Sequence, residues 1–121
     1  MADFVLTDGP DTFTGTDAAD FISALGGDDY VNAGGGNDTV SGGGGNDTML
    51  GVAGNDVLFG GQGSDILYGS AGNDFIYSGQ GNDQAYGGNG ADQMYGDNGD
   101  DSLRGDLGDD FINGNRGQDT V

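Results

Sequence analysis

The sequence predicts an all-β fold, a flattened parallel solenoid in which two nine-residue units make one coil. Three observations predict it. An Asp recurs at every ninth position from Asp11 to Asp119 without an insertion, an apolar residue follows each of these Asp residues two positions later, and 29 of the 121 residues are Gly. A short fixed period is typical of repeat architectures, whose single units cannot bury a core alone. Thirteen units predict about six and a half coils.

The charge of the chain limits the classes of partner that it can bind. All 21 acidic residues are Asp, the only basic residues are Arg104 and Arg116, and the formal net charge is −19. A nucleic-acid partner is excluded because neutralising phosphates needs clusters of Lys and Arg. Only 33% of the residues are apolar, a composition that in water is typical of disordered chains. We therefore expect a cation to be the partner on which folding depends.

Each unit is numbered so that the recurring Asp is position 6. Positions 1 to 6 are rich in Gly, Asn and Asp, which form tight turns and tolerate positive φ. Position 4 is Gly in every unit except the second, where Ala18 replaces it. We expect a turn over positions 1 to 6, with the glycines at positions 1 and 4 giving the backbone its conformational freedom.

Positions 7 to 9 carry Thr, Val, Ile, Phe and Tyr and predict a three-residue strand in each unit. Only position 8 is apolar in every unit, so its side chain is expected to face inward while positions 7 and 9 face out. Residues 18 apart then lie above one another, and position 8 forms two facing columns. Its residues, with Phe4 in phase before them, are Phe13, Ile22, Val31, Val40, Met49, Leu58, Leu67, Ile76, Ala85, Met94, Leu103, Ile112 and Val121.

The chain is expected to be one continuous domain with an irregular first unit. Residues 1–14 form a degenerate, cap-like repeat that contains Leu6, Thr7 and Pro10, and residues 15–121 form the regular repeats. Because the second unit also lacks its turn glycine, the first two units are expected to cap the coil and to be poorer in ligands than the rest.

The three units GGGGNDTML, GVAGNDVLF and GGQGSDILY, residues 42–68, represent the pattern. It resembles the nonapeptide G-G-x-G-x-D-x-U-x of the repeats-in-toxin (RTX) proteins, a calcium-binding parallel β-helix signature. The resemblance extends from Leu6 to Val121. It implies a parallel β-roll, with Ca²⁺ in the turns between successive coils.

Turn glycines and Asp suit this ion, because Ca²⁺ takes six to eight oxygens at about 2.3–2.6 Å and glycine turns can aim carbonyl groups inward. Two rows of stacked Asp residues, with six and five gaps, offer at most 11 sites. The expected carboxylate ligands are Asp29, Asp38, Asp47, Asp56, Asp65, Asp74, Asp83, Asp92, Asp101 and Asp110, with Asp11, Asp20 and Asp119 as weaker candidates. The expected carbonyl ligands are Gly27, Gly36, Gly45, Gly54, Gly63, Gly72, Gly81, Gly90, Gly99 and Gly108.

Calcium is expected to decide whether the chain folds. Eleven divalent ions would supply 22 positive charges and change the formal net charge from −19 to +3. Because the predicted core is thin, we expect a disordered chain without calcium and a β-rich rod with it. The remaining acidic residues of the later turns, Asp97, Asp100, Asp106 and Asp109, are expected to form a solvated face, with further ligation as the alternative.

The outer faces predict columns of stacked apolar side chains, which stabilise neighbouring strands and can form a partner site. At position 9, Leu50, Tyr68 and Tyr86 follow one another on one sheet, and Phe59, Tyr77 and Tyr95 on the other, with Val57 and Phe75 of position 7 beside the second set. The repeat continues to Val121, so the last coil exposes an unpaired strand. Both a frayed terminus and a head-to-tail filament or other homo-oligomer fit this end.

No enzymatic activity is expected, because the chain has no His, Cys, Lys or Glu for general-base or nucleophilic chemistry. We also expect neither a cleaved signal peptide nor a membrane span. The sequence therefore predicts an extracellular calcium-binding protein with a structural or adhesive role, which can self-assemble into filaments. The alternative is a calcium-triggered folding and secretion module detached from a larger RTX enzyme or toxin. The resemblance implies bacterial export by type I secretion to the cell surface or medium.

Overall fold

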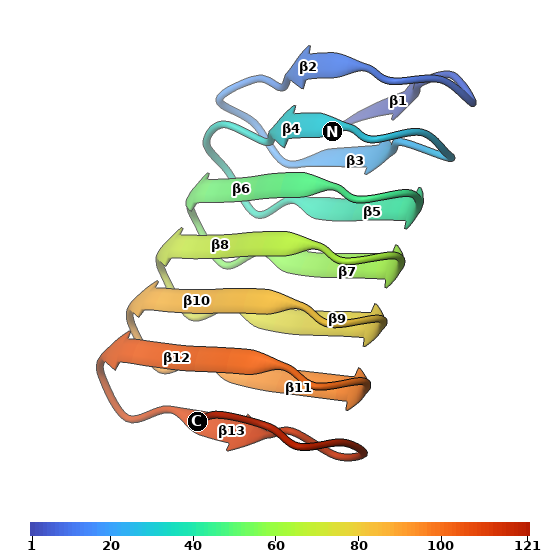
Figure 1. Cartoon of the computed structure of the whole chain (residues 1–121). Coiled ribbons are helices and arrows are strands. Elements are labelled where there is room, and N and C mark those ends of the chain that lie inside the picture. Colours follow the sequence, from blue (N-terminus) through green and yellow to red (C-terminus); the bar gives the residue numbers. More distant parts are fainter.

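The structure, a computed structural model, describes all residues 1–121 and contains only strands, turns and loops. Two parallel sheets face each other across a flattened solenoid (Figure 1). The seven-stranded sheet has the order β1-β3-β5-β7-β9-β11-β13, and the six-stranded sheet the order β12-β10-β8-β6-β4-β2. Odd-numbered and even-numbered strands therefore lie on opposite sides, which confirms the prediction of two units per coil. The strands are β1 (Ala2–Val5), β2 (Thr12–Thr14), β3 (Asp20–Ser23), β4 (Tyr30–Asn32), β5 (Thr39–Gly44), β6 (Thr48–Ala53), β7 (Val57–Gln62), β8 (Ile66–Ala71), β9 (Phe75–Gln80), β10 (Gln84–Asn89), β11 (Gln93–Asn98), β12 (Ser102–Leu107) and β13 (Phe111–Asn113).

The register between coils is constant. Leu58 of β7 pairs with Val40 of β5 on one side and with Ile76 of β9 on the other. Each of these steps is 18 residues, as the nine-residue period predicts for two units per coil. No helix in the chain could span a membrane.

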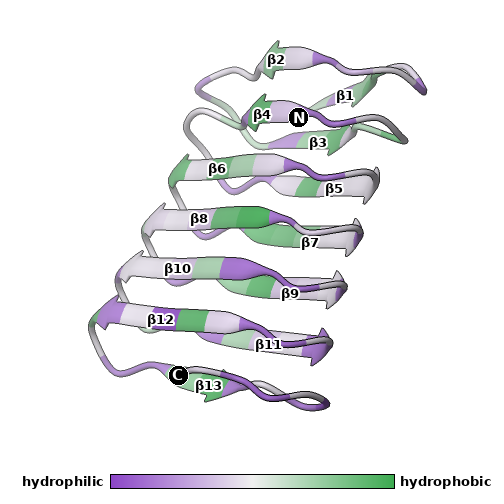
Figure 2. Cartoon of the chain, viewed as in Figure 1, coloured by the Kyte–Doolittle hydropathy of each residue, from purple (hydrophilic) through white to green (hydrophobic).

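Position 8 forms the core. Its residues from Ile22 to Leu103 are buried, and Ala24 and Ala33 of position 1 pack among them. Phe4, Phe13 and Ile112 are partly buried at the ends of this core, and Figure 2 shows apolar bands on the successive strands. The prediction that every position 8 side chain faces inward is wrong for Val121, which is 73% exposed because no coil covers it.

Most strands are longer than the three residues predicted. Strands β5 to β12 each contain six residues, from position 7 to position 3 of the next unit, whereas β2, β4 and β13 have three. The longer strands form because glycine also pairs between coils, as Gly43 does with Gly61. Stacking satisfies the backbone groups of positions 1 to 3, so the turn is reduced to positions 4 to 6.

Positive φ occurs at positions 2 and 4 and not at position 1, where it was predicted. At position 4, φ is 115° at Gly45 and 129° at Gly54, and at position 2 it is 99° at Gly43 and 81° at Val52. Glycine is the commonest residue at position 1 for a different reason. A methyl group on Gly42 would place its carbon 2.3 Å from Asp47 Oδ2, so the glycine leaves room for a carboxylate.

Candidate metal centres

The recurring Asp side chains are inside the coil. Asp11, Asp110 and Asp119, which lie in the end coils, are partly exposed. The others are no more than 3% exposed, although burying a carboxylate is costly unless it has a partner. These buried residues are Asp20, Asp29, Asp38, Asp47, Asp56, Asp65, Asp74, Asp83, Asp92 and Asp101.

One carboxylate oxygen of each recurring Asp from Asp29 to Asp119 accepts a hydrogen bond from the neighbouring coil. The backbone N–H of Asp47 donates to Oδ1 of Asp65 at 2.8 Å, and Asp65 N–H donates to Oδ1 of Asp83 at 2.7 Å. The same bond joins all 11 pairs of stacked Asp residues, at 2.7–3.0 Å. The bonds connect the residues into two continuous rows that run along the coil.

The other oxygen has no partner. From Asp29 to Asp101, Oδ2 of each recurring Asp is buried and accepts no hydrogen bond. Buried polar atoms in proteins almost always have a partner, and an ionised oxygen without one costs several kcal/mol. Nine such oxygens in two rows therefore require a cation or a proton beside them.

A main-chain carbonyl oxygen packs near several of these carboxylate oxygens where position 1 is glycine. A methyl carbon on Gly42 would lie 2.3 Å from Asp47 Oδ2 and 2.6 Å from the carbonyl oxygen of Gly60. At Gly69 the corresponding distances, to Asp74 Oδ2 and the Gly87 carbonyl oxygen, are 2.4 Å and 2.7 Å. A carboxylate oxygen and a main-chain carbonyl oxygen from adjacent coils thus lie close to the same glycine, where any side chain would clash with both.

This donor set suits calcium. Both donors are hard oxygens, and Ca²⁺ accepts backbone carbonyl groups together with carboxylates. No three acidic side chains come together anywhere in the chain, so each site must use main-chain oxygens as well. A zinc or copper site would instead need His or Cys, which the chain lacks.

Burial raises the pKa of the nine recurring Asp carboxyl groups from Asp29 to Asp101. Desolvation is the main cause, and neighbouring Asp residues raise the pKa further, whereas the hydrogen bond from the preceding Asp N–H opposes the rise. The pKa of Asp65 is raised to about 7. It is raised to about 6 for Asp47, Asp56, Asp74 and Asp83. A cation or a proton that neutralises these carboxylates therefore stabilises the folded coil.

The first coil differs from the rest. Thr7 donates its N–H and its hydroxyl to Asp11 Oδ2, both at 2.8 Å. Thr16 does the same for Asp20 Oδ2, at 2.7 and 2.8 Å. These bonds satisfy the oxygen that has no partner in the later coils, and the backbone bond from Thr16 lowers the pKa of Asp20.

Two features of the turns went beyond the sequence prediction. The carbonyl oxygen near Asp47 Oδ2 comes from position 1 of the next coil, at Gly60, whereas the carbonyl oxygen of Gly36, at the predicted position 4, packs closely against Gly54 of the next coil. A side-chain ladder also runs along position 5, where Asn46 Oδ1 accepts from the N–H of Ser64 at 2.8 Å. The recurrence of Asn at position 5 was the signal for this ladder.

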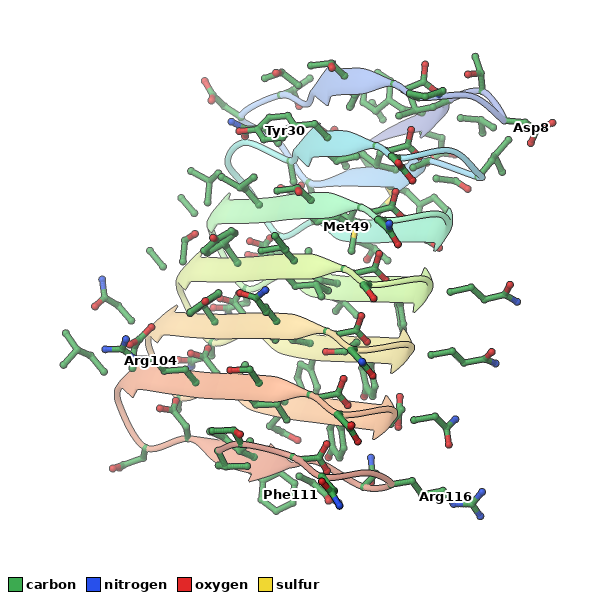
Figure 3. The ribbon with its side chains drawn as sticks, in the orientation of Figure 1. Asp8, Tyr30, Met49, Arg104, Phe111 and Arg116 are labelled. Atoms are coloured by element: carbon green, nitrogen blue, oxygen red, sulfur yellow. The ribbon has the colours of Figure 1, made fainter.

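The additional Asp residues of the later turns make their contacts outside the two rows. Asp100 Oδ1 accepts from the N–H of Gln118 at 2.9 Å, and Asp106 pairs with Arg104 at 2.5 Å. Figure 3 shows Arg104 and Arg116 projecting from the rod, whereas Met49 lies between the sheets. Asp97 Oδ1 likewise accepts from the side chain of Asn115.

Comparison with known proteins supports the same chemistry. The family model of the RTX calcium-binding nonapeptide repeat (4 copies) matches residues 6–40, 14–49, 26–58, 50–85 and 86–121. These matches cover nearly the whole chain. A search of curated proteins found no match.

Proposed function

Because the chain belongs to the family of RTX calcium-binding nonapeptide repeats, with calcium as its cofactor, we propose that it is an extracellular structural protein that folds when calcium binds. The observation that carries this proposal is the double row of buried Oδ2 atoms without partners. A chain with these rows and a net charge of −19 needs cations inside it to remain compact.

The proposed carboxylate ligands are the recurring Asp residues from Asp29 to Asp110, with main-chain carbonyl groups of the glycine turns completing each site. Asp29 to Asp101 are supported by their free oxygens, and Asp110 by its place in the row. Asp11 and Asp20 are weaker ligands because threonine already satisfies their Oδ2 atoms, which leaves Oδ1 as the buried oxygen of Asp20 without a partner. Asp119 is weaker because it lies in a partly exposed end coil.

The extracellular location rests on calcium supply. Oxygen sites of extracellular modules bind with dissociation constants of about 10⁻⁴–10⁻³ M. At millimolar calcium, a site with a constant near 10⁻⁴ M adds about 1.5 kcal/mol to stability. Summed over a row, this stabilises the rod outside a cell and leaves it unfolded where calcium is scarce. Secretion of the unfolded chain, by a type I route, agrees with this dependence.

The positions of the recurring residues support a structural role. The recurring Asp, the glycines and position 8 build the coil and its metal rows, and the chain has no His, Cys, Lys or Glu for acid–base chemistry. The alternative proposal, a folding and export module of a larger RTX protein, predicts that a fused enzyme gains calcium-dependent folding. A fused reporter whose activity does not respond to calcium would argue against this alternative.

Assembly into filaments is a further part of the proposal. Strands β1 and β13 form the two edges of the seven-stranded sheet. Edge strands readily pair with another chain, and Val5 and Phe111 on these strands are 71% and 53% exposed. Light scattering coupled to size exclusion, with and without calcium, tests this step. Monomers alone at high protein concentration would rule out filaments.

Circular dichroism tests the central proposal. The full chain is stripped of metal with a chelator and titrated with Ca²⁺, with Mg²⁺ as the control ion. We expect a disordered spectrum without metal and a cooperative change to a β spectrum with calcium. Mg²⁺ should be much less effective because it prefers a smaller octahedral shell and keeps its waters. A β spectrum that persists in chelator would contradict the proposal.

A further inference from the structure

One residue breaks the pattern at position 1. This position holds Gly in nine units, Ala in two and Leu in the first, and a single unit has a hydroxyl group there, at Ser78. Its neighbours of the same sheet in the coils before and after, Gly60 and Gly96, are both glycine. Ser78 therefore carries the only position 1 side chain that could act as a metal ligand.

The Ser78 side chain is directed inward. The residue is 0% exposed, and its Oγ has no hydrogen-bond partner in the chain. A buried hydroxyl without a partner is unfavourable, because it loses its bonds to water and gains nothing in return. Packing alone would favour alanine or glycine here, as in most of the other units.

The repeat register places this side chain beside a metal row. In the adjoining coil of the same sheet, a methyl carbon on Gly96 would lie 2.4 Å from Asp101 Oδ2 and 2.7 Å from the Gly114 carbonyl oxygen. Ser78 holds position 1 of the preceding coil, in the same nine-residue unit as Asp83, whose own Oδ2 also lacks a partner.

We propose that the Ser78 hydroxyl is an additional calcium ligand, acting beside Asp83. This inference rests on the proposed function and assigns to one site a third kind of oxygen, besides carboxylate and main-chain carbonyl. A hydroxyl oxygen is a hard donor of the type that calcium accepts. The site beside Asp83 therefore holds its ion more tightly than sites flanked by glycine, in the middle of the rod.

The experiment compares S78A and S78G with the wild-type chain in saturating calcium, using S102A as the matched control. Ser102 is exposed on β12 and donates no hydrogen bond from its side chain, so S102A should leave the melting temperature unchanged. We expect S78A to lower the melting temperature by about 4 °C. Native mass spectrometry at limiting calcium should show one ion fewer in both Ser78 variants.

The sign of the S78A effect separates ligation from packing. Alanine keeps the Cβ and removes a hydroxyl without a partner, so a purely structural serine would leave the melting temperature equal or raise it. That result, with an unchanged ion count, overturns the inference but not the proposed function. A wild-type chain that takes up no calcium overturns both. Should S78A fail to fold, S78G carries the test, because glycine is the usual residue at this position.

Discussion

The backbone N–H of Asp47 donates to Oδ1 of Asp65 in the next coil at 2.8 Å, and this bond determines which oxygen is left for a metal. It orients the Asp65 carboxylate along the row and leaves Oδ2 buried without a partner. The same bond at every step makes each recurring Asp from Asp29 to Asp101 a donor to one neighbouring coil and an acceptor from the other. The rows are therefore structural and metal-binding at once.

Removing one central charge should have opposite effects with and without calcium. D65N keeps an acceptor oxygen for the Asp47 N–H but removes the buried charge. In calcium we expect the free energy of unfolding to fall by about 1.5 kcal/mol, the contribution of one occupied site at millimolar calcium. Without calcium the variant should have more β structure than the wild type, because less charge is buried. Denaturant titrations followed by circular dichroism measure both.

The control for this comparison is D109N, because Asp109 is exposed and belongs to neither row. It removes the same charge from the surface and should change the stability in calcium by less than about 0.5 kcal/mol. Equal effects of D65N and D109N would show that net charge alone, and not ligation, links calcium to folding.

Acid should stabilise the calcium-free coil. The pKa of Asp65 is about 7 in the folded chain, against an ordinary value of 3.8. Between these two pH values the folded chain binds more protons than the unfolded chain, so its stability rises as the pH falls. The penalty for burying ionised carboxylates is fully present above about pH 7 and is gone below 3.8.

Far-UV circular dichroism of metal-free protein between pH 8 and pH 4 measures this effect. In the same range the midpoint calcium concentration for folding should increase toward acid, because protons compete for the carboxylates. A calcium-free chain that loses β structure on acidification would be incompatible with the burial of these groups.

Relieving backbone strain at position 2 should stabilise the folded rod. Val52 has φ of 81°, a conformation that is strained for a β-branched residue. Glycine occupies the same position with φ of 99° at Gly43. V52G should therefore raise the free energy of unfolding in calcium by about 1 kcal/mol, measured by urea unfolding. G43V is the converse control, and it should destabilise the rod by a similar or larger amount.

The aromatic column on the odd-numbered strands should contribute measurably to stability. Tyr77 stacks on Phe59 and on Tyr95, with ring centroids 5.1 Å apart in both pairs. Tyr86 on the other sheet has one stacked partner, Tyr68, at 4.9 Å. Each aromatic pair is worth about 0.5–1.5 kcal/mol. Because Tyr77 has one more stacked partner than Tyr86, Y77S should lower the free energy of unfolding in calcium by about that much more than Y86S. Equal losses in thermal unfolding would mean that the second stacked ring adds nothing.

The repeat architecture was predictable from the amino-acid sequence. A strict nine-residue period with one apolar position per unit allows few ways to bury that position, so the parallel coils, the 18-residue register and the inward columns from Ile22 to Leu103 followed from it. The aromatic stacks were also predictable, because period and register together place Phe59 and Tyr77 on adjacent strands. Calcium followed from the Asp and glycine pattern and from its resemblance to the RTX repeat.

The contacts of each site residue became visible only in the folded coil. It showed that position 1 glycine makes room for a carboxylate, as Gly42 does for Asp47, and that positive φ belongs to positions 2 and 4. It also showed which oxygen of Asp65 is free, and that threonine caps Asp11. The physical reason is that period specifies which residues stack, whereas hydrogen bonds and close contacts between coils 18 residues apart specify where each atom points.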